Sequence, residues 1–206
     1  DCYGKAFSIS QANEKAFDYL VSFATEMADW SLLARVYEDA LRGKGRGSAD
    51  PEIIVKLALV YWRELALVDK AEAYFRRVRK DDPVQPEMLE FYRAHYRETG
   101  EPTKILALLD AAQRVAGDDA SLSLSKEMAQ IAEEEVGNLE KAIEVWKRIH
   151  RRFPNDDDTV VALRRLYRQA DPPKWNALRE LLKEMVEAVP KEELETRIAL
   201  RTEVVE

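Results

Sequence analysis

Apolar residues recur at helical spacing along the whole chain. Between residues 12 and 28 they follow steps of three and four, as at Leu20, Phe23, Ala24 and Met27, which places them on one face of a helix. The same spacing continues through 53–67, 88–96, 128–136, 160–167 and 178–189. A sustained alternation of apolar and polar residues does not occur, so we predict an all-α protein without a sheet.

Prolines and capping residues divide this pattern into about eleven short helices. Asp50 can cap a helix that begins with a proline, a residue that loses no hydrogen bond in the first turn. Pro86 and Pro102 repeat the proline part of this arrangement, and Asp69 with Glu72 has the spacing of a capping box. Helices this short are unstable alone in water, so we expect them to pack in antiparallel pairs.

The second helix of each pair carries a repeated triplet of core positions. A small or aliphatic residue leads, a bulky one follows four positions later, and another apolar residue comes three positions after that. Five triplets fit this pattern: Leu33/Tyr37/Ala40, Ala71/Phe75/Val78, Ile105/Leu109/Ala112, Ala142/Trp146/Ile149 and Leu178/Leu182/Met185. Their leading residues are 38, 34, 37 and 36 positions apart. We therefore expect Phe75 and Trp146 to be buried between neighbouring pairs.

The turn inside each pair repeats as well. Five residues before the leading position the first four pairs have a small residue, which permits a tight turn: Ala28, Ala66, Gly100 and Gly137. Nine residues before it, the first three pairs have Ala24, Trp62 and Tyr96. In the fourth and fifth pairs the equivalent residues, Ala132 and Tyr167, come earlier. We predict a turn that is longer by one residue before Ala142 and by two before Leu178.

Helix pairs with a period near 34 residues resemble tetratricopeptide repeats (TPR). The best single match is EIIVKLALVYWRELALVDKAEAYFRRVRKDDPVQ at 52–85, and GNLEKAIEVWKRIHRRFP at 137–154 resembles a second helix. The resemblance implies one right-handed α-solenoid domain over 1–206, with degenerate repeats at 14–47, 52–85, 86–119, 122–156 and 157–190. A lone first helix follows at 191–206, and we expect the chain to be a fragment of a longer protein.

The same resemblance implies a concave groove, lined by first helices, that binds a protein or peptide without catalysis. The implied groove residues are Tyr19, Lys56, Arg63, Arg97, Lys126, Gln130, Arg165 and Arg168. Their cationic row predicts an acidic or carboxylate-terminated partner. The alternative is that these arginines pair with the interspersed glutamates, which are Glu64, Glu90, Glu98 and Glu133. A second functional hypothesis is a structural or regulatory segment of a larger machine, such as the half-a-TPR scaffolds of RNA processing.

Charge and composition narrow the classes of partner. The chain has 32 Lys and Arg against 39 Asp and Glu, a net charge of -7, and is 46% hydrophobic, which excludes a disordered protein. Basic clusters at 76–80 and 147–152 fall on second helices. We expect no nucleic-acid partner, because the net charge opposes binding to phosphates. These clusters instead contain helix-supporting pairs, Glu72 with Arg76 and Glu144 with Arg148.

Candidate chemistry is sparse. Cys2 is the only cysteine, and His95 and His150 are the only histidines, so no intrachain disulfide or cysteine zinc site can form. We expect no enzyme activity, no metal and no cofactor. The glycine-rich stretch at 42–48 lacks the ending of a phosphate-binding loop and is interpreted as a connector. All four tryptophans, Trp30, Trp62, Trp146 and Trp175, are assigned to packing.

Two further expectations concern the surroundings of the protein. No stretch of about 18 apolar residues occurs, so we expect no membrane insertion. We also expect a cytoplasmic location, unless a signal segment has been removed. The last helix should present Leu194, Ile198 and Leu200 without a partner helix, and this incomplete interface predicts self-association or further repeats.

Overall fold

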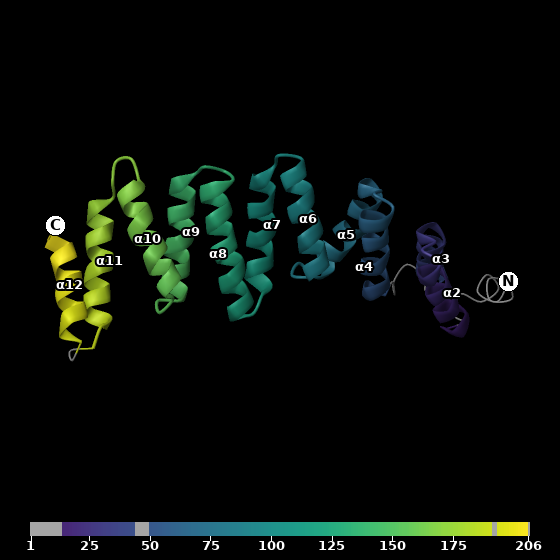
Figure 1. Cartoon of the computed structure of the whole chain (residues 1–206), viewed down its shortest axis with the longest axis horizontal. Helices are drawn as coiled ribbons and strands as arrows, with labels where there is room; N and C mark the ends of the chain where they lie inside the picture. The colour runs from purple at the N-terminus through teal and green to yellow at the C-terminus, as the bar shows by residue number, and fades with distance from the viewer. Residues whose placement is uncertain (1–13, 44–49, 191–192, 206) are drawn as a thin grey trace. The chain divides into compact units, whose positions relative to one another are not determined.

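The computed structural model describes residues 14–43, 50–190 and 193–205. Within these ranges the chain forms eleven α-helices, one π-helical segment and no strand (Figure 1), so the predicted all-α fold is confirmed. The elements are α2 Glu14–Glu26, α3 Trp30–Gly43, α4 Pro51–Leu59, η1 Val60–Glu64, α5 Val68–Asp81, α6 Pro86–Glu98, α7 Pro102–Val115, α8 Asp118–Glu134, α9 Leu139–Arg152, α10 Asp157–Gln169, α11 Trp175–Ala188 and α12 Leu194–Val205. None of these described helices is both long and apolar enough to cross a membrane.

The chain divides into two compact units, residues 1–95 and 96–206, with the boundary near the end of α6. In the first unit, α2 packs on α3, α3 on α4 and α4 on α5. In the second unit, each helix from α7 to α12 packs on the next one along the chain (Figure 1). We call the even-numbered helices first helices and the odd-numbered ones second helices. The expectation of a single domain over the whole chain stays a prediction.

The core of both units is built on the triplets of the second helices. Every residue of the five triplets is buried except Met185, which is half-buried. Phe75 of α5 is fully buried and stacks on Phe91 of α6, with 4.8 Å between the ring centroids. Trp146 occupies the equivalent position of α9 and is also buried. The predicted register of the second helices is therefore confirmed.

Each pair is closed by one backbone hydrogen bond across its turn. The donor N–H belongs to the residue four positions before the leading core residue: Asp29, Leu67, Glu101, Asn138 and Lys174. The acceptors are the carbonyls near the end of the first helix, at 2.7–2.8 Å: Ala24, Tyr61, Tyr96, Ala132 and Tyr167. In the first four pairs the residue before the donor has a positive φ: Ala28, Ala66, Gly100 and Gly137. The small residues of the sequence pattern thus occupy left-handed positions that end the first helices.

The closing hydrogen bond spans different lengths of chain. Donor and acceptor are five residues apart in the first and third pairs, six in the second and fourth, and seven in the fifth. The longer turns predicted before Ala142 and Leu178 are confirmed. The second pair differs from the prediction, because the acceptor position, held by Ala24 in the first pair and Tyr96 in the third, is occupied by the buried Tyr61 and not by Trp62. An extra residue is accommodated in η1, where Leu65 N–H donates to the Val60 carbonyl at 3.0 Å, and the wider turn rotates Trp62 to a half-buried position.

Exchanging the turn residues should change stability in opposite directions. Ala66 has a φ of 52° and Gly137 a φ of 68°, a region that costs an L-residue about 1–2 kcal/mol. We expect Ala66→Gly to raise the free energy of unfolding by about 1 kcal/mol and Gly137→Ala to lower it by about as much. A Cβ on Gly137 would meet no atom within 4 Å, so only backbone strain contributes. Urea unfolding checks this, and a stabilising Gly137→Ala would contradict it.

Helix starts follow the predicted chemistry at some positions and not at others. The Asp50 carboxylate accepts the Glu52 N–H at 3.0 Å and caps α4 as predicted. The predicted capping box at Asp69 is wrong, because α5 already begins at Val68 and Leu67 occupies the cap position without a side-chain bond. Asp69 therefore lies inside the first turn, where its charge still favours the helix dipole.

Candidate binding surface

The predicted binding residues lie on first helices, and in the first unit both cations pair with a carboxylate. Lys56 of α4 contacts Glu52 of the same helix at 2.6 Å. Arg63 of η1 reaches Glu90 of α6 at 2.6 Å and lies over the Trp62 ring, 5.2 Å from its centroid. The Arg63 pair therefore joins two successive first helices.

The predicted apolar contact, Tyr19, lies on an exposed stripe of α2. Its side chain is 47% exposed and stacks on Phe23, with 6.1 Å between the ring centroids. Phe23 and Met27 are exposed too, although the helical spacing had placed them on the packed face. The buried residues of α2 are spaced four positions apart, at Ala16, Leu20 and Ala24. The packed face of this helix is therefore narrower than predicted.

In the second unit, Arg97 makes a two-pronged contact with a neighbouring first helix. Its Nε and Nη2 donate to both carboxylate oxygens of Glu135, at 2.8–3.2 Å. Glu135 lies at the end of α8. The hydrogen bonds that Arg97 donates to this carboxylate raise the pKa of Arg97. Such paired donors fix the orientation of the guanidinium as well as its charge.

Lys126 of α8 lies between two aspartates at the start of α10. Its Nζ is 2.6 Å from Asp156 and 2.7 Å from Asp158. Asp156 also caps α10, accepting the Thr159 N–H at 2.9 Å and the Thr159 hydroxyl at 2.5 Å. Burial alone would raise the pKa of Asp156, but the hydrogen bonds from Lys126 and Thr159 outweigh burial and lower it.

Two carboxylates hold the arginines of α10. Glu133 of α8 accepts from Arg165, with Nη2 to Oε2 at 2.8 Å and a second contact from Nη1. Glu203 of α12 accepts from both Arg164 and Arg168. The hydrogen bond from Arg165 lowers the pKa of Glu133, and those from Arg164 and Arg168 lower the pKa of Glu203. These contacts tie α10 to the first helix on either side.

Together these contacts form a chain of ion pairs that we call the first-helix ladder. In the second unit it comprises Arg97–Glu135, Lys126–Asp156/Asp158, Arg165–Glu133 and Arg164/Arg168–Glu203. Within the second unit it links Arg97 to α8, α8 to α10 and α10 to α12. Gln130 lies exposed on α8 between Lys126 and Glu133. The predicted cationic row is thus an alternation of both charges, and its role in partner binding stays a prediction.

The ladder predicts a loss of stability in acid. Because the folded pKa values of Glu133, Asp156 and Glu203 are lowered, their contribution is fully present above the unfolded values, about 4. It is lost as the pH falls through the folded values. We expect the free energy of unfolding to be level between pH 7 and 5 and to fall below about pH 4. Urea unfolding at each pH measures this, and Glu133→Gln should reduce the fall. Greater stability at pH 3 than at pH 6 would contradict it.

The histidines and the single cysteine were the remaining candidates for chemistry. Cys2 lies outside the described residues. His95 stacks on Phe91, with 5.6 Å between the ring centroids, and His150 Nε2 lies 3.2 Å from Glu184. No group of three or more His, Cys, Asp or Glu within the described ranges is arranged to hold a metal ion.

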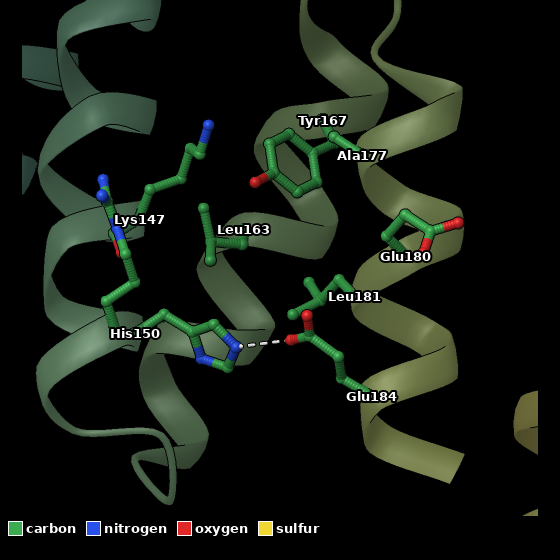
Figure 2. Close-up of a pocket in the computed structure, with 9 residues that line it drawn as sticks. Lys147, His150, Leu163, Tyr167, Ala177, Glu180, Leu181 and Glu184 are labelled. Carbon is green, nitrogen blue, oxygen red and sulfur yellow. Dashed lines mark hydrogen bonds and ion pairs between the residues drawn. The ribbon is translucent and has the colours of Figure 1, made fainter. Parts of the chain in front are cut away.

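The structure contains a pocket that the sequence did not indicate. A cavity of about 250 Å³ lies between α9, α10 and α11 of the second unit (Figure 2). Its lining comes from three helices: Lys147, His150, Arg151, Leu163, Tyr167, Ala177, Glu180, Leu181 and Glu184. The basic cluster at 147–152 was its one visible signal, and from the sequence it was interpreted only through net charge and helix-supporting pairs. The residues of α11 that face it are some thirty positions away in sequence.

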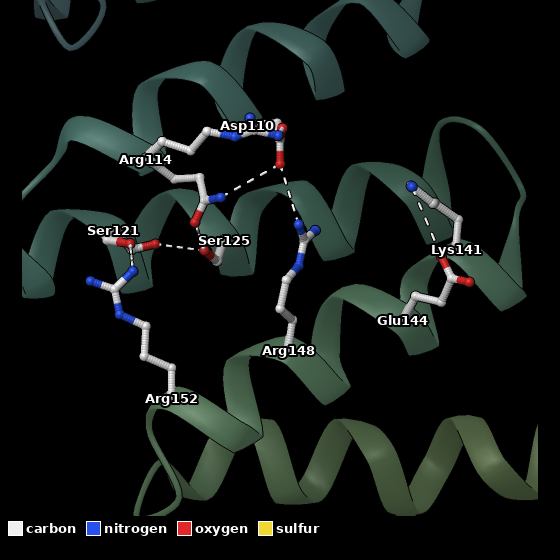
Figure 3. A network of polar contacts seen from close by, with 9 residues as sticks. Asp110, Arg114, Ser121, Ser125, Lys141, Glu144, Arg148 and Arg152 are labelled. Carbon is white, nitrogen blue, oxygen red and sulfur yellow. Dashed lines mark hydrogen bonds and ion pairs between the residues drawn. The ribbon is translucent and has the colours of Figure 1, made fainter.

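Two arginines of that cluster have structural partners. Arg148 Nη1 lies 3.3 Å from Asp110 of α7 (Figure 3), and Arg152 Nη2 lies 2.7 Å from Asp118 of α8. The predicted pair of Glu144 with Arg148 does not form, because Arg148 is directed to the neighbouring second helix. The other predicted helix pair, Glu72 with Arg76, is present at 3.2 Å.

Comparisons with known proteins concern the fold. No protein-family model matches the chain, and no curated protein matches it. A tetratricopeptide repeat protein from Parabacteroides merdae is 12% identical over 89% of this chain and 72% of its own, with a TM-score of 0.51. MamA from Desulfovibrio magneticus is 17% identical over 84% of this chain and 93% of its own, with a TM-score of 0.46. Yeast Tom70 is 15% identical over 98% of this chain and 41% of its own, with a TM-score of 0.42. The helix pairs, their turns and the Parabacteroides likeness show that the chain has a TPR-like, all-α solenoid fold.

Proposed function

We propose that this protein is a non-enzymatic interaction scaffold that binds a protein or peptide on the first-helix face of its second unit. The observation that carries the proposal is the first-helix ladder, which holds cations of α6, α8 and α10 in fixed positions on an exposed surface. Preset side chains lose little conformational entropy when a partner binds. The TPR-like fold supports the same function.

The arginines of the ladder keep donors for a second carboxylate. Arg97 uses Nε and Nη2 for Glu135, which leaves Nη1, and Arg165 uses Nη1 and Nη2 for Glu133, which leaves Nε. A guanidinium has five N–H donors in a fixed plane. An acidic or carboxylate-terminated segment can therefore bind these arginines without breaking the ladder.

The same face also offers apolar and neutral contacts. Val161 lies one turn before Arg165 on α10 and is 62% exposed, which is high for an aliphatic side chain in a helix. Gln130 of α8 adds an amide that can both donate and accept. A partner with alternating acidic and apolar side chains fits this surface better than a purely acidic one.

A charge exchange tests the proposal. The probe is a fluorescein-labelled ten-residue peptide with acidic and leucine residues and a free carboxyl terminus, compared with its amidated form. Arg165→Glu should weaken binding of the free-carboxylate peptide more than tenfold. The double variant Glu133→Arg with Arg165→Glu restores an ion pair, so it should recover the thermal midpoint while its peptide binding stays weak, because the cation has moved to α8.

The exchange separates the binding role from a merely structural one. If Arg165 serves only the ladder, the double variant binds the peptide as the original protein does, and the binding surface is assigned wrongly. Arg76→Glu on second helix α5 is the control for net charge and should leave affinity within twofold. Equal binding of the free and amidated peptides would contradict recognition of a terminal carboxylate.

A further inference from the structure

We propose that the pocket between α9, α10 and α11 is a second binding site, which takes a peptide segment with one large apolar side chain followed by carboxylates. The site is formed by second helices α9 and α11 and the facing side of α10, all within the second unit. It shares no residue with the first-helix ladder, so it does not depend on the proposed function.

Two cross-helix contacts delimit the site. Lys174 at the start of α11 lies 3.0 Å from Glu140 of α9, and His150 Nε2 lies 3.2 Å from Glu184 of α11 (Figure 2). Both helices advance ten residues between these contacts, so α9 and α11 run side by side in the same direction. Ten helical residues span about 15 Å. The crevice is therefore held open at a fixed width over roughly the length of a four-residue extended segment.

The floor of the crevice is apolar and small. Leu163 and Tyr167 of α10 and Leu181 and Ala177 of α11 lie between the two charged walls (Figure 2). The cavity of about 250 Å³ exceeds the roughly 150 Å³ that accepts a benzene molecule. It is below the roughly 300–1,000 Å³ of ordinary ligand pockets. One phenylalanine or leucine side chain matches this volume.

The charges at the rim select the flanking groups. On the acidic wall, Glu180 pairs with Lys183 at 2.8 Å and Glu184 with His150. On the basic wall, neither Lys147 nor Arg151 has a carboxylate within ion-pair distance in the part of the chain that the structure describes. Lys147 and Arg151 are therefore the lining cations that no carboxylate of the described chain neutralises, and they favour carboxylates next to the apolar anchor.

The surface between α7 and α9 provides a comparison, because there a cation of α9 has a carboxylate partner within the protein. Between α7 and α9, Arg148 reaches Asp110, which also accepts from Arg114 at 2.5 Å (Figure 3). Arg148 on the side of α7 thus has a carboxylate partner within the protein, which it shares with Arg114, whereas Lys147 and Arg151 on the side of α11 have none among the described residues. The α9–α11 crevice therefore offers two cations to an anionic partner.

The test uses the peptide acetyl-Gly-Ser-Phe-Glu-Glu-Ser-Gly-amide and backbone amide NMR shifts of the full chain. We expect saturable shifts at Lys147, Ala177 and Leu181. Lys147→Glu with Arg151→Glu should weaken binding more than tenfold, and Ala177→Leu, which fills the cavity, should do the same without removing a charge. Lys141→Glu on α9 with Arg179→Glu on α11 changes the net charge by the same amount at residues that do not line the pocket, and it should stay within twofold of the original affinity.

Peptide variants test the two halves of the recognition. Replacing phenylalanine by glycine, or both glutamates by glutamine, should each weaken binding at least fivefold. Absence of saturable shifts, equal loss in the charge-matched control, or equal binding of the glycine peptide would overturn the proposal. Concentration-dependent self-association that Ala177→Leu abolishes would also overturn it in favour of a second copy. Glu133→Arg with Arg165→Glu should leave this affinity unchanged, which separates failure here from failure of the proposed function.

Discussion

Trp146→Ala is expected to lower the free energy of unfolding by about 3–5 kcal/mol, the usual cost of removing a buried aromatic side chain. Its side chain is only 4% exposed in the middle of α9, in a triplet whose other members, Ala142 and Ile149, are buried as well. Trp175→Ala supplies the matched control, because the same substitution removes a side chain that is 58% exposed at the first residue of α11. We expect it to cost less than about 1 kcal/mol.

Urea unfolding followed by circular dichroism measures both variants, and the second unit contains both positions. A cost for Trp175→Ala as large as that for Trp146→Ala would mean that the Trp175 side chain is buried in solution. The sequence assigned both tryptophans to packing, and for Trp175 this was wrong. Trp175 is the first residue of α11, and a place just inside a second helix did not by itself show that the side chain is buried.

Asp156→Ala is expected to cost about 2–4 kcal/mol, while Asp158→Ala costs less than about 1 kcal/mol. Both carboxylates contact Lys126 at nearly the same distance. Asp156 additionally caps α10, worth about 1 kcal/mol, and satisfies the fully buried Thr159 hydroxyl, whose loss of a partner costs about 1–3 kcal/mol. The Asp158 side chain is 80% exposed, and exposed ion pairs contribute little.

Asp156→Asn separates the two contributions. Asparagine caps helices as well as aspartate does, so this variant should retain most of the stability and lose only the attraction to Lys126. Thermal unfolding at pH 7 in low and in 0.5 M salt measures the difference. If Asp156→Asn is as unstable as Asp156→Ala, the ion pair and not the cap dominates, and the assignment of the larger effect is wrong.

The helix pairs and the second-helix register could be predicted because their signals are local. The triplet around Phe75 repeats within a single helix, and the positive φ of Gly100 follows from a small residue at a fixed distance from Ile105. The extra residue near Trp62 escaped prediction, because a π-helical turn keeps the residue types of an α-helix and changes only which side chain faces the core.

The pairing of the cations could not be predicted in detail, since it depends on how neighbouring first helices meet. Arg63 and Arg165 do pair with Glu90 and Glu133, as the alternative interpretation had it. The partner of Arg168, Glu203, lies 35 residues along the chain on a helix expected to be without a partner. Contacts at such separations follow from packing and not from spacing along one helix. Of the three side chains predicted to lack a partner helix, Ile198 is exposed, while the side chains of Leu194 and Leu200 are outside what the structure describes.

The closing turns show where this protein tolerates changes of length. Because the donor of each closing hydrogen bond always stands four residues before the leading core residue, a turn of five, six or seven residues leaves the second helix in the same phase. Adding or deleting one residue between Ala170 and Lys174 should therefore keep Leu178 and Leu182 in the core. The same change inside α11 would turn every later core side chain by about 100°. The fifth turn, which is the longest of the five, is thus where we expect a change of one residue to leave the repeats packed.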